Sequence, residues 1–429
     1  MISLSNSIFY KRNYNEISKY TKYEKYLHLV NKNSNFKFSN EEVLFINPDE
    51  PNELTLIKEK YSVIVLTDII ENSDFVFELL NNLKKLLEPG GKLIISTLNT
   101  KWFFLSKIFE LFNLKNKSKN TTYLKDKTIS NIFNSVGFDL VCKSTRQIVP
   151  FKLFNIGIFL NYFFELFLLP FNLGIKKYLI FRNNEISSIQ FKKTIVVPAK
   201  NEEGNIAKLF ERIGNKENYE IIFSLGKSND GTEKVVKNLI ESNKRYDVKY
   251  IIQTKNGKAN AVWEAVNISK GDYIAVLDAD LSVDPEVIDD FFGIVEKNYA
   301  DFINGTRLIY DLEYGSMRTI NKIGNKIFQY IVRIIINRNL TDSLCGTKVF
   351  SRKLFNKINN FQKDHKLFDP FGDFDMLFTA AFTGEKILEL PVHYKARTYG
   401  TTQISRFKDG FNLIKYLLKS FILFNTSRN

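Results

Sequence analysis

Two carboxylates, Asp278 and Asp280, follow an apolar run in the stretch "GDYIAVLDADLSVDPEVI" at residues 271–288. The run from Tyr273 to Leu277 predicts a buried parallel strand, and "SVDPE" predicts the start of a helix. Both acids therefore stand at the carboxyl end of a central strand, which is the edge of an open α/β sheet where ligands bind. Carboxylates one residue apart can hold Mg²⁺ or Mn²⁺ through oxygen, and such a metal can hold a diphosphate. The alternative is that both are solvated loop acids that cap the following helix.

Strand–helix patterns that could position these acids precede them in the chain. They are "TIVVPAKNEEGNI" (194–206), "YEIIFSLGKSNDGTEKVV" (219–236) and "DVKYIIQTKNGKANAVWEAV" (247–266). Each joins a short buried strand through a polar or glycine-containing loop to a helix. We therefore expect an α/β domain with a mononucleotide-binding half-sheet in the second half of the chain.

The first half of the chain shows a shorter strand–helix–strand succession. "YSVIVLTDII" (61–70) predicts a strand, "FVFELLNNLKKLLEPGG" (75–91) an amphipathic helix and "KLIISTLN" (92–99) the next strand. Before it, residues 8–30 predict a polar, aromatic-rich helix followed by an Asn-rich link. No strand–turn–helix is expected before residue 60.

Composition and charge limit the classes of partner that the chain is expected to bind. The 429 residues suggest two or three domains, and the 44% hydrophobic share is that of a soluble globular protein. The formal net charge of +14 suits anionic partners such as nucleotide diphosphates or lipid phosphates. No Lys/Arg cluster with interleaved aromatics is present, so nucleic acid is not expected as a partner. Cys142 and Cys345 lack metal-ligand spacing, and the N-terminus lacks the apolar core of a signal peptide, which together predict a cytoplasmic protein.

Two apolar stretches bear on membrane contact. Residues 151–181 are the most apolar segment, but Lys152, Glu165 and Pro170 divide it into runs too short for a bilayer span of about 20 residues. We expect a core and interdomain helix pair there, with a membrane-interface segment as the alternative. Residues 406–429 predict a basic amphipathic helix, which either lies on the inner face of the cytoplasmic membrane or packs onto the preceding domain.

Motifs of the second half resemble glycosyltransferase family 2, which has the GT-A Rossmann-like fold, and within it the dolichyl-phosphate mannosyltransferase-like branch. "VVPAKNEE", "SNDGT", "GKANAV" and "DADL" occur in the family's order. They are followed by "INGTRLIY", "TDSLCGTKVFSR", "FDPFGDFDMLFTAA" and "LPVHYKARTYGTTQISRFKDG". The resemblance covers about residues 191–410 and implies a nucleotide-diphosphate sugar as donor and a divalent metal as cofactor.

Residues 40–182 resemble the later half of a class I S-adenosylmethionine-dependent methyltransferase. The likeness rests on "YSVIVLTDII", "PGG", "KLIIST" and "TISNIFNSVGFDLV". That family holds its cofactor on a glycine-rich turn after the first strand, whereas the first glycine of this chain is Gly90. We therefore expect a partial, degenerate methyltransferase-type α/β domain that serves stability, docking or dimerisation. The whole chain looks like a bacterial architecture in which such a domain precedes a glycosyltransferase.

The family-2 resemblance implies a donor site whose residues carry over position by position. They are Pro198, Ala199, Asn201, Glu202, Asp230, Lys258, Asp278 and Asp280. Glu202 would be the acidic contact near base and ribose, Asp278 the ribose and metal contact, and Asp280 the metal ligand. For Asp230 a helix cap is the alternative, and for Lys258 a solvated turn lysine. Where the family usually has an acid after its second strand, this chain has Leu225, which cannot accept a hydrogen bond from a base.

The acceptor-side motifs contain three basic residues and two acids. Arg307, Lys348 and Arg397 could clamp phosphate, with a surface salt bridge as the alternative for each. Asp373 and Asp375, in "FGDFD", correspond to the family's acidic acceptor-side motif, and either could be the general base, with Asp375 preferred. An acceptor that is already a lipid phosphate would require no base.

These observations predict a metal-dependent inverting glycosyltransferase acting on a polyprenyl-phosphate or a cell-envelope polysaccharide or lipid acceptor, peripheral to the inner membrane face. The expected divisions are a degenerate methyltransferase-like domain at 1–185, a GT-A domain at 186–405 and the amphipathic helix at 406–429. One alternative is a bifunctional methyltransferase–glycosyltransferase. The other is a catalytically silent nucleotide-sugar-binding or scaffold protein, which Leu225 would favour.

Overall fold

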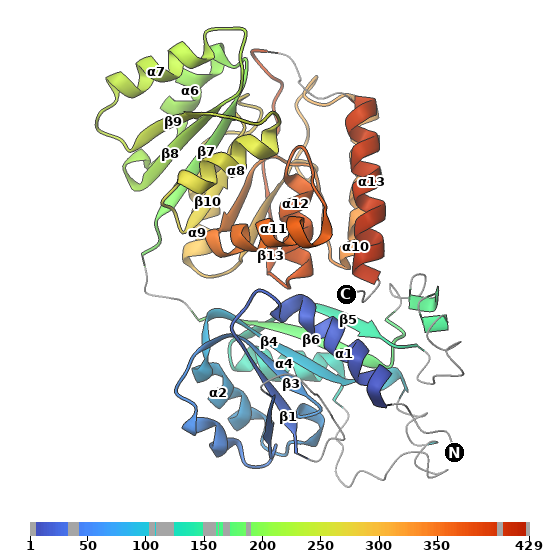
Figure 1. Cartoon of the computed structure of the whole chain (residues 1–429). Helices are drawn as coiled ribbons and strands as arrows, with labels where there is room; N and C mark the ends of the chain where they lie inside the picture. The colour runs from blue at the N-terminus through green and yellow to red at the C-terminus, as the bar shows by residue number, and fades with distance from the viewer. Residues whose placement is uncertain are drawn as a thin grey trace. The chain divides into compact units, whose positions relative to one another are not determined.

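The chain divides into two compact units, and both are α/β folds (Figure 1). Unit 1 comprises residues 1–185 with 421–429, and unit 2 comprises residues 186–420. The computed structural model describes residues 6–32, 43–102, 108, 124–148, 160–161, 163–165, 172–185, 190–400 and 406–425. The predicted fold class, two Rossmann-like α/β domains in succession, is confirmed.

Unit 1 is built on a six-stranded sheet in the order β2-β1-β3-β4-β6-β5. Its strands are β1 (Tyr26–Asn31), β2 (Val43–Ile46), β3 (Tyr61–Thr67), β4 (Leu87–Leu98), β5 (Phe138–Arg146) and β6 (Lys176–Asn183). The first four strands are parallel, and β6 runs antiparallel to both β4 and β5. Among the described residues of this unit, the helices are α1 (Asn6–Thr21), α2 (Val76–Leu86) and α4 (Asp126–Ser135), with 3₁₀ turns at Pro51–Leu56, Ile70–Asn72 and Thr100–Trp102.

Two strands that the sequence analysis did not identify, β1 and β2, precede residue 60. The predicted helix over 8–30 ends at Thr21, and β1 follows it. Two buried polar residues interrupt the apolar pattern by which β1 could have been recognised in the sequence. His28 Nε2 hydrogen-bonds Thr67 Oγ1 on β3 at 2.9 Å, and Asn31 Nδ2 donates to the Asp68 carbonyl at 3.1 Å. These partners satisfy polar groups that otherwise break the apolar pattern of a central strand.

The expected helix pair over 151–181 is wrong at its C-terminal end. Residues 176–183 form β6, which is buried along its whole length between β4 and β5. A short apolar run with both faces covered cannot be assigned to helix or strand by periodicity alone. Most of the remaining segment lies outside the described residues.

Unit 2 is built on a seven-stranded sheet in the order β13-β11-β12-β10-β7-β8-β9. Its strands are β7 (Lys193–Ala199), β8 (Tyr219–Leu225), β9 (Val248–Ile252), β10 (Tyr273–Val276), β11 (Phe302–Thr306), β12 (Lys348–Ser351) and β13 (Ile387–Pro391). Strands β7 to β10 are parallel, and β12 is antiparallel to β10 and β11. The described helices are α6 (Glu203–Arg212), α7 (Thr232–Ser242), α8 (Lys258–Ile268), α9 (Val287–Glu296), α10 (Thr319–Ile336), α11 (Arg352–His365), α12 (Asp373–Phe382) and, up to residue 420, α13 (Arg406–Asn425), with a 3₁₀ turn at Lys216–Asn218.

The central strands of unit 2 are apolar because helices or loops cover both faces of the sheet. Ile195, Val196 and Val197 of β7 are all fully buried. Burial of one such side chain stabilises the fold by about 1.5–3 kcal/mol. This rigid strand positions the polar segment that begins at Pro198, at the carboxyl edge of the sheet.

Helix α12 lies between α10 and α13 in unit 2. The ring of Phe374 lies 6.3 Å from that of Phe328 on α10 and 5.7 Å from that of Tyr416 on α13. Leu413 and Leu417 of α13 are buried with Tyr416, so this face of α13 packs onto the unit as one of the two sequence interpretations proposed. Its other face stays exposed. Among the helices in the described part of the chain, none is long and apolar enough to cross a bilayer.

Candidate functional site

Asp278 lies just beyond the end of β10 and is paired with a lysine. Lys258 Nζ, at the first residue of α8, is 2.5 Å from Asp278 Oδ1. Burial by itself raises the pKa of Asp278, but the ammonium groups of Lys258 and Lys348 outweigh burial and hold it below its usual value. A Cβ at Gly346 would lie 2.6 Å from Lys258 Nζ and 2.9 Å from Asp278 Cγ. The pair therefore requires a glycine at this position of the opposing loop.

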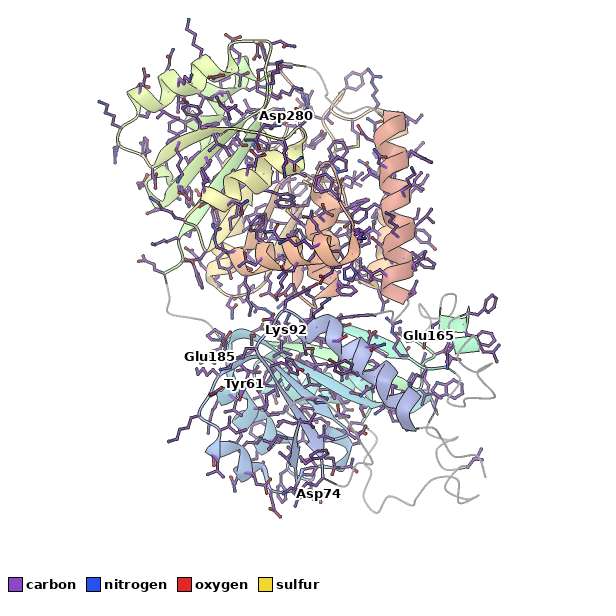
Figure 2. The ribbon with its side chains drawn as sticks, in the orientation of Figure 1. Tyr61, Asp74, Lys92, Glu165, Glu185 and Asp280 are labelled. Atoms are coloured by element: carbon purple, nitrogen blue, oxygen red, sulfur yellow. The ribbon has the colours of Figure 1, made fainter. Side chains whose placement is uncertain are left out.

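Asp280, labelled in Figure 2, uses both carboxylate oxygens. Its Oδ1 accepts hydrogen bonds from the backbone N and Oγ of Ser282, at 3.0 and 2.6 Å. Its Oδ2 lies 2.6 Å from Arg397 Nη2. Leu281, which lies between Asp280 and Ser282 in the chain, has a φ of 58°, in the left-handed region. This conformation turns the backbone so that Ser282 lies beneath the Asp280 carboxylate. Asp280 is 5% exposed.

Glu202 completes the acidic group. It occupies the N-cap position of α6, and its Oε2 accepts a hydrogen bond from Asn205 Nδ2 at 2.6 Å. Arg397 Nη1 is 3.9 Å from Glu202 Oε1, so one guanidinium faces both Glu202 and Asp280. Burial raises the pKa of Glu202, the Asn205 hydrogen bond lowers it, and the negative charge of Asp280 raises it further, to about 7.

The loops that would face a nucleotide are held by their own side chains. Pro198 and Ala199 end β7 and pair with Ser224 and Leu225 of β8. Leu225 is buried in the core, so it faces away from solvent at the position where the family usually has an acid.

Asn201 and Asp230 tie two of these loops together. Asn201 has a φ of 57°, and its Oδ1 accepts from the Asn229 backbone at 2.7 Å. Asp230 Oδ1 accepts from Thr232 N at 3.1 Å, at the start of α7, but the N-cap of this helix is Gly231, so Asp230 is not the helix cap that the sequence left open. Its Oδ2 accepts from Tyr399 Oη at 3.2 Å.

Lys348 lies close to both the acceptor-side acid Asp373 and the donor-edge acid Asp278. It is fully buried, its ammonium donates to the Cys345 carbonyl, and it lies 3.0 Å from Asp373 Oδ1. Asp373 is the first residue of α12, and its charge also raises the pKa of Lys258. Asp373 therefore lies within electrostatic reach of the Lys258–Asp278 pair.

Asp375 lies in a different environment from Asp373. It is fully buried, and its Oδ2 accepts hydrogen bonds from Gln362 Nε2 at 2.7 Å and from the Asp369 backbone at 2.9 Å. Burial and then the charge of Asp369 raise its pKa to about 7. Because Asp375 is fully buried whereas Asp373 is 6% exposed, this geometry favours Asp373 over the sequence preference for Asp375 as the acid that meets an acceptor.

Arg307 is already committed to a protein carboxylate. Its Nε and Nη2 donate to Asp342 at 2.7 and 3.0 Å, both residues are buried, and its guanidinium lies 5.1 Å from the ring of Tyr394. The salt-bridge interpretation therefore describes Arg307, although the bridge is buried and not at the surface. Release of Arg307 to clamp phosphate would leave Asp342 unpaired in the interior.

Several residues of the site were missed in the sequence. They are Asn205, Ser282, Gly346 and Tyr399. Ser282 and Gly346 stand inside motifs already quoted, so their positions were a signal. Asn205 and Tyr399 also stand inside quoted motifs, but the partner of Tyr399, Asp230, lies far away in the chain, so the sequence carried no signal of that contact.

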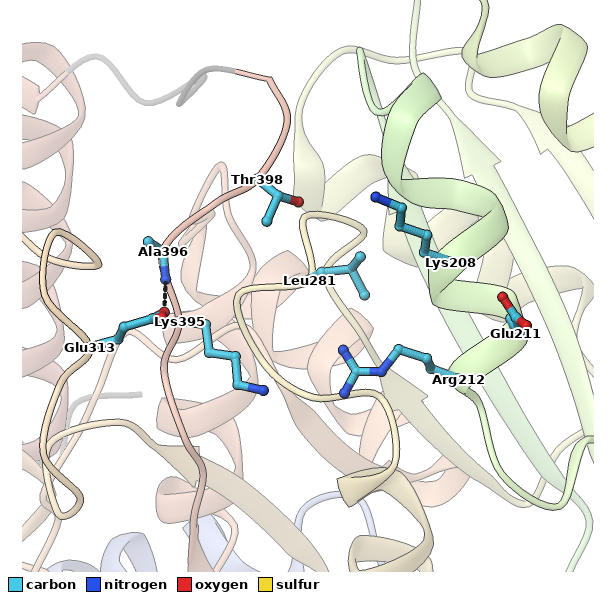
Figure 3. A pocket seen from close by; sticks show the side chains of 8 residues that line it. All are labelled: Lys208, Glu211, Arg212, Leu281, Glu313, Lys395, Ala396 and Thr398. Carbon is cyan, nitrogen blue, oxygen red and sulfur yellow. Dashed lines mark hydrogen bonds between the residues drawn. The ribbon is translucent and has the colours of Figure 1, made fainter.

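A pocket of about 330 Å³ adjoins the segment formed by residues 394–400, hereafter the 394–400 segment (Figure 3). Its walls are Lys208, Glu211 and Arg212 of α6, Leu281, Glu313, and Lys395, Ala396 and Thr398 of the segment. On one wall, Ala396 N donates to Glu313 Oε2 at 2.7 Å. The two residues that flank Arg397 thus border open space.

Residues 194–359 match the model of glycosyl transferase family 2. This stretch of unit 2 is therefore similar to the family 2 glycosyltransferases. Residues 7–143 match a methyltransferase domain, which begins earlier than the sequence resemblance suggested. The recognition of both domain types is confirmed.

Several curated proteins match about half of the chain. The low-salt glycan biosynthesis hexosyltransferase Agl6 of Haloferax volcanii is 25% identical over 229 residues, covering 52% of this chain and 52% of that protein. The dolichol-phosphate mannosyltransferase of Pyrococcus furiosus is 26% identical over 234 residues, covering 53% of this chain and 62% of that protein. The chain thus spans little more than half the length of these relatives.

Solved structures also align with about half of the chain. Glucosyl-3-phosphoglycerate synthase from Mycobacterium tuberculosis, in complex with Mn²⁺, UDP and phosphoglyceric acid, is 17% identical, covers 54% of this chain and 78% of that chain, and has a TM-score of 0.42. The mannosyltransferase PcManGT from Pyrobaculum calidifontis, in complex with GDP-Man and Mn²⁺, is 15% identical, covers 54% and 64%, and has a TM-score of 0.38.

Proposed function

We propose that unit 2 is an inverting, metal-dependent glycosyltransferase that moves a sugar from a nucleotide-diphosphate sugar to a polyprenyl-phosphate or cell-envelope glycan acceptor. The observation that carries this proposal is the convergence of Glu202, Asp278, Asp280 and Lys258 at the carboxyl edge of the parallel strands. That edge is where an open α/β sheet binds ligands. The family-2 match over residues 194–359 supports the same chemistry.

The donor set fits a hard divalent cation such as Mg²⁺ or Mn²⁺. Among the described residues no three Asp, Glu, His or Cys side chains form a ready-made metal cluster. Asp280 with Asp278 would supply carboxylate oxygen, and a diphosphate and water would supply the remaining ligands, as is usual for Mg²⁺. The bound metal would neutralise charge on the departing diphosphate. Lys258, with its pKa raised by Asp278 against the effect of burial, stays charged and can contribute to the same task.

The acceptor would approach from the side of α12. Asp373, paired with Lys348, is the candidate general base for a hydroxyl acceptor, with Asp375 supporting the turn that holds it. A phosphate acceptor is already ionised and needs no base. In that case Lys348 would help to align the attacking oxygen.

A lipid-linked acceptor is supported by the outer faces of α10 and α13, which flank α12. Helix α10 contains no Asp or Glu, and apolar side chains recur along its exposed side with three cations. The exposed apolar residues of α10 are Ile320, Ile323, Ile327, Tyr330, Ile331 and Ile334, and the cations are Lys322, Lys326 and Arg333. Helix α13 adds Phe411, Ile414 and Leu418 with Lys415 and Lys419. Apolar and basic faces of this kind suit peripheral contact with an anionic inner membrane leaflet.

Unit 1 is proposed to be a supporting domain that does not transfer methyl groups. Asp68, the acid that follows β3 at the carboxyl edge of its sheet, is 2.5 Å from Lys176 Nζ. Its neighbour Glu71 is buried, and burial together with the charge of Asp68 raises the pKa of Glu71 to about 7. Asp68 is thus paired with a lysine of the protein, and Glu71 is buried with a raised pKa. Neither acid is therefore favoured as a contact for the ribose of S-adenosylmethionine. Measurable binding of S-adenosylmethionine to the full chain would contradict this assignment.

The test is transfer of labelled sugar from a panel of UDP- and GDP-sugars with Mn²⁺ or EDTA. Polyprenyl phosphate in anionic vesicles, polyprenyl phosphate in zwitterionic vesicles and a soluble glycan would be compared as acceptors. We expect metal-dependent transfer that is fastest with the anionic vesicles, and loss of that preference when Ile323 and Ile327 are both replaced by serine. Absence of both transfer and nucleotide binding would favour the scaffold alternative. Transfer to the soluble glycan alone would refute the lipid acceptor.

A further inference from the structure

Arg397 occupies the carboxylate oxygen that a metal would need. Asp280 Oδ1 is taken by Ser282, and Asp280 Oδ2 is 2.6 Å from Arg397 Nη2. The other guanidinium nitrogen faces Glu202 at 3.9 Å. Asp278 has a different cation, Lys258. The acids of this site are therefore neutralised by two basic side chains of the chain itself.

We propose that Arg397 is an internal counter-ion that exchanges with the metal when donor binds. Without nucleotide, the guanidinium holds Asp280 and weakens metal binding. With a nucleoside diphosphate present, the metal takes Asp280, and Arg397 moves onto the diphosphate oxygens. This inference rests on the proposed function, and it replaces the acceptor-side role expected for Arg397 with a donor-side role.

The balance of charge makes such an exchange feasible. A guanidinium tethered beside its partner acts at an effective concentration in the millimolar range or above, so it competes with free divalent cations at a site that has few protein ligands. A diphosphate changes this balance in two ways, because it adds oxygen ligands for the metal and offers Arg397 a bidentate anionic partner. Metal and Arg397 would therefore oppose each other in the absence of nucleotide and cooperate in its presence.

The backbone around Arg397 is anchored, whereas its side chain has room to move. Lys395 N donates to the Ser282 carbonyl at 2.8 Å, and Tyr399 Oη donates to Asp230. The Tyr399 ring packs closely on Gly204, where a Cβ would lie 2.6 Å from it. The Arg397 side chain is 33% exposed, and its neighbours Ala396 and Thr398 line the pocket of Figure 3. A side-chain swing without release of the segment is therefore sufficient.

The test measures Mn²⁺ affinity by electron paramagnetic resonance on the full chain, without nucleotide and with saturating UDP or GDP. We expect Arg397→Gln to bind Mn²⁺ about tenfold more tightly than the original protein without nucleotide, and several-fold more weakly with the effective nucleotide. Arg397→Lys should lie between the two. Lys395→Gln, which removes a cation of the same segment that pairs with Asp284 at 2.7 Å, should show no reversal.

The reversal of sign is the decisive observation, since a merely structural role of Arg397 would shift both affinities in one direction. Equal Mn²⁺ affinity of the two proteins without nucleotide, with thermal unfolding unchanged, would overturn the exchange while leaving the proposed function intact. Failure of the original protein to bind Mn²⁺ with either nucleotide would overturn both.

Discussion

Replacement of Gly346 by alanine should disable the donor site without unfolding the protein. The new Cβ would lie 2.6 Å from Lys258 Nζ, 2.9 Å from Asp278 Cγ and closer still to Asp278 Oδ2. The pair must therefore move by roughly 0.5–1 Å, and a displacement of that size in a reacting site costs about 10²-fold in rate, or about 2.7 kcal/mol. Gly346 does not adopt a positive φ, so alanine strains the site by its side chain and not by its backbone.

The assay for Gly346→Ala is kcat/KM for sugar transfer, together with nucleotide affinity by calorimetry in Mn²⁺. Gly293→Ala in α9 is a matched control, because a Cβ at Gly293 meets no atom within 4 Å. The control should keep full activity and gain about 0.5–1 kcal/mol of stability, as expected for glycine within a helix. If Gly346→Ala is folded and keeps normal nucleotide affinity and kcat/KM, the Lys258–Asp278 pair lies outside the donor site.

Three further predictions follow from the same geometry. Asp280→Asn removes a charged oxygen ligand, so nucleotide affinity in Mn²⁺ should fall at least about tenfold, and an unchanged dissociation constant would exclude Asp280 as a ligand. With a hydroxyl acceptor, Asp373→Asn should lower kcat by roughly 10²- to 10⁴-fold while donor binding persists, whereas Asp375→Asn should act mainly on unfolding temperature; the opposite pattern would restore Asp375 as the base. Burial holds the pKa of His28 at about 4, below its ordinary value of 6.5. The unfolded chain therefore binds a proton first as pH falls from 6.5 to 4, and stability should decrease by up to on the order of 3 kcal/mol in urea titrations; a His28→Asn variant that keeps the same pH slope would refute this.

The local sequence pattern was sufficient to predict much of the secondary structure of unit 2. Strands such as β7 and β8 are largely apolar and are followed by loops rich in Asn, Asp and Gly. The sequence therefore predicted both that these segments are strands and where they lie in the chain. The same logic put Asp278 and Asp280 at a strand end. It failed for β1, where the buried His28 and Asn31 are satisfied by residues on other segments.

By itself, the sequence determined the α/β class, the two domain types and the position of Asp278 and Asp280 at the carboxyl edge of the sheet, because each depends on residues within one strand–loop–helix segment. Only the tertiary structure decided which charges meet. Arg307 is bound to Asp342 and Arg397 to Asp280, whereas the sequence offered each arginine only a phosphate or an unnamed surface acid as partner. Hydrophobic periodicity reports whether a position is buried, whereas the partner of a buried charge is set by the way distant segments pack.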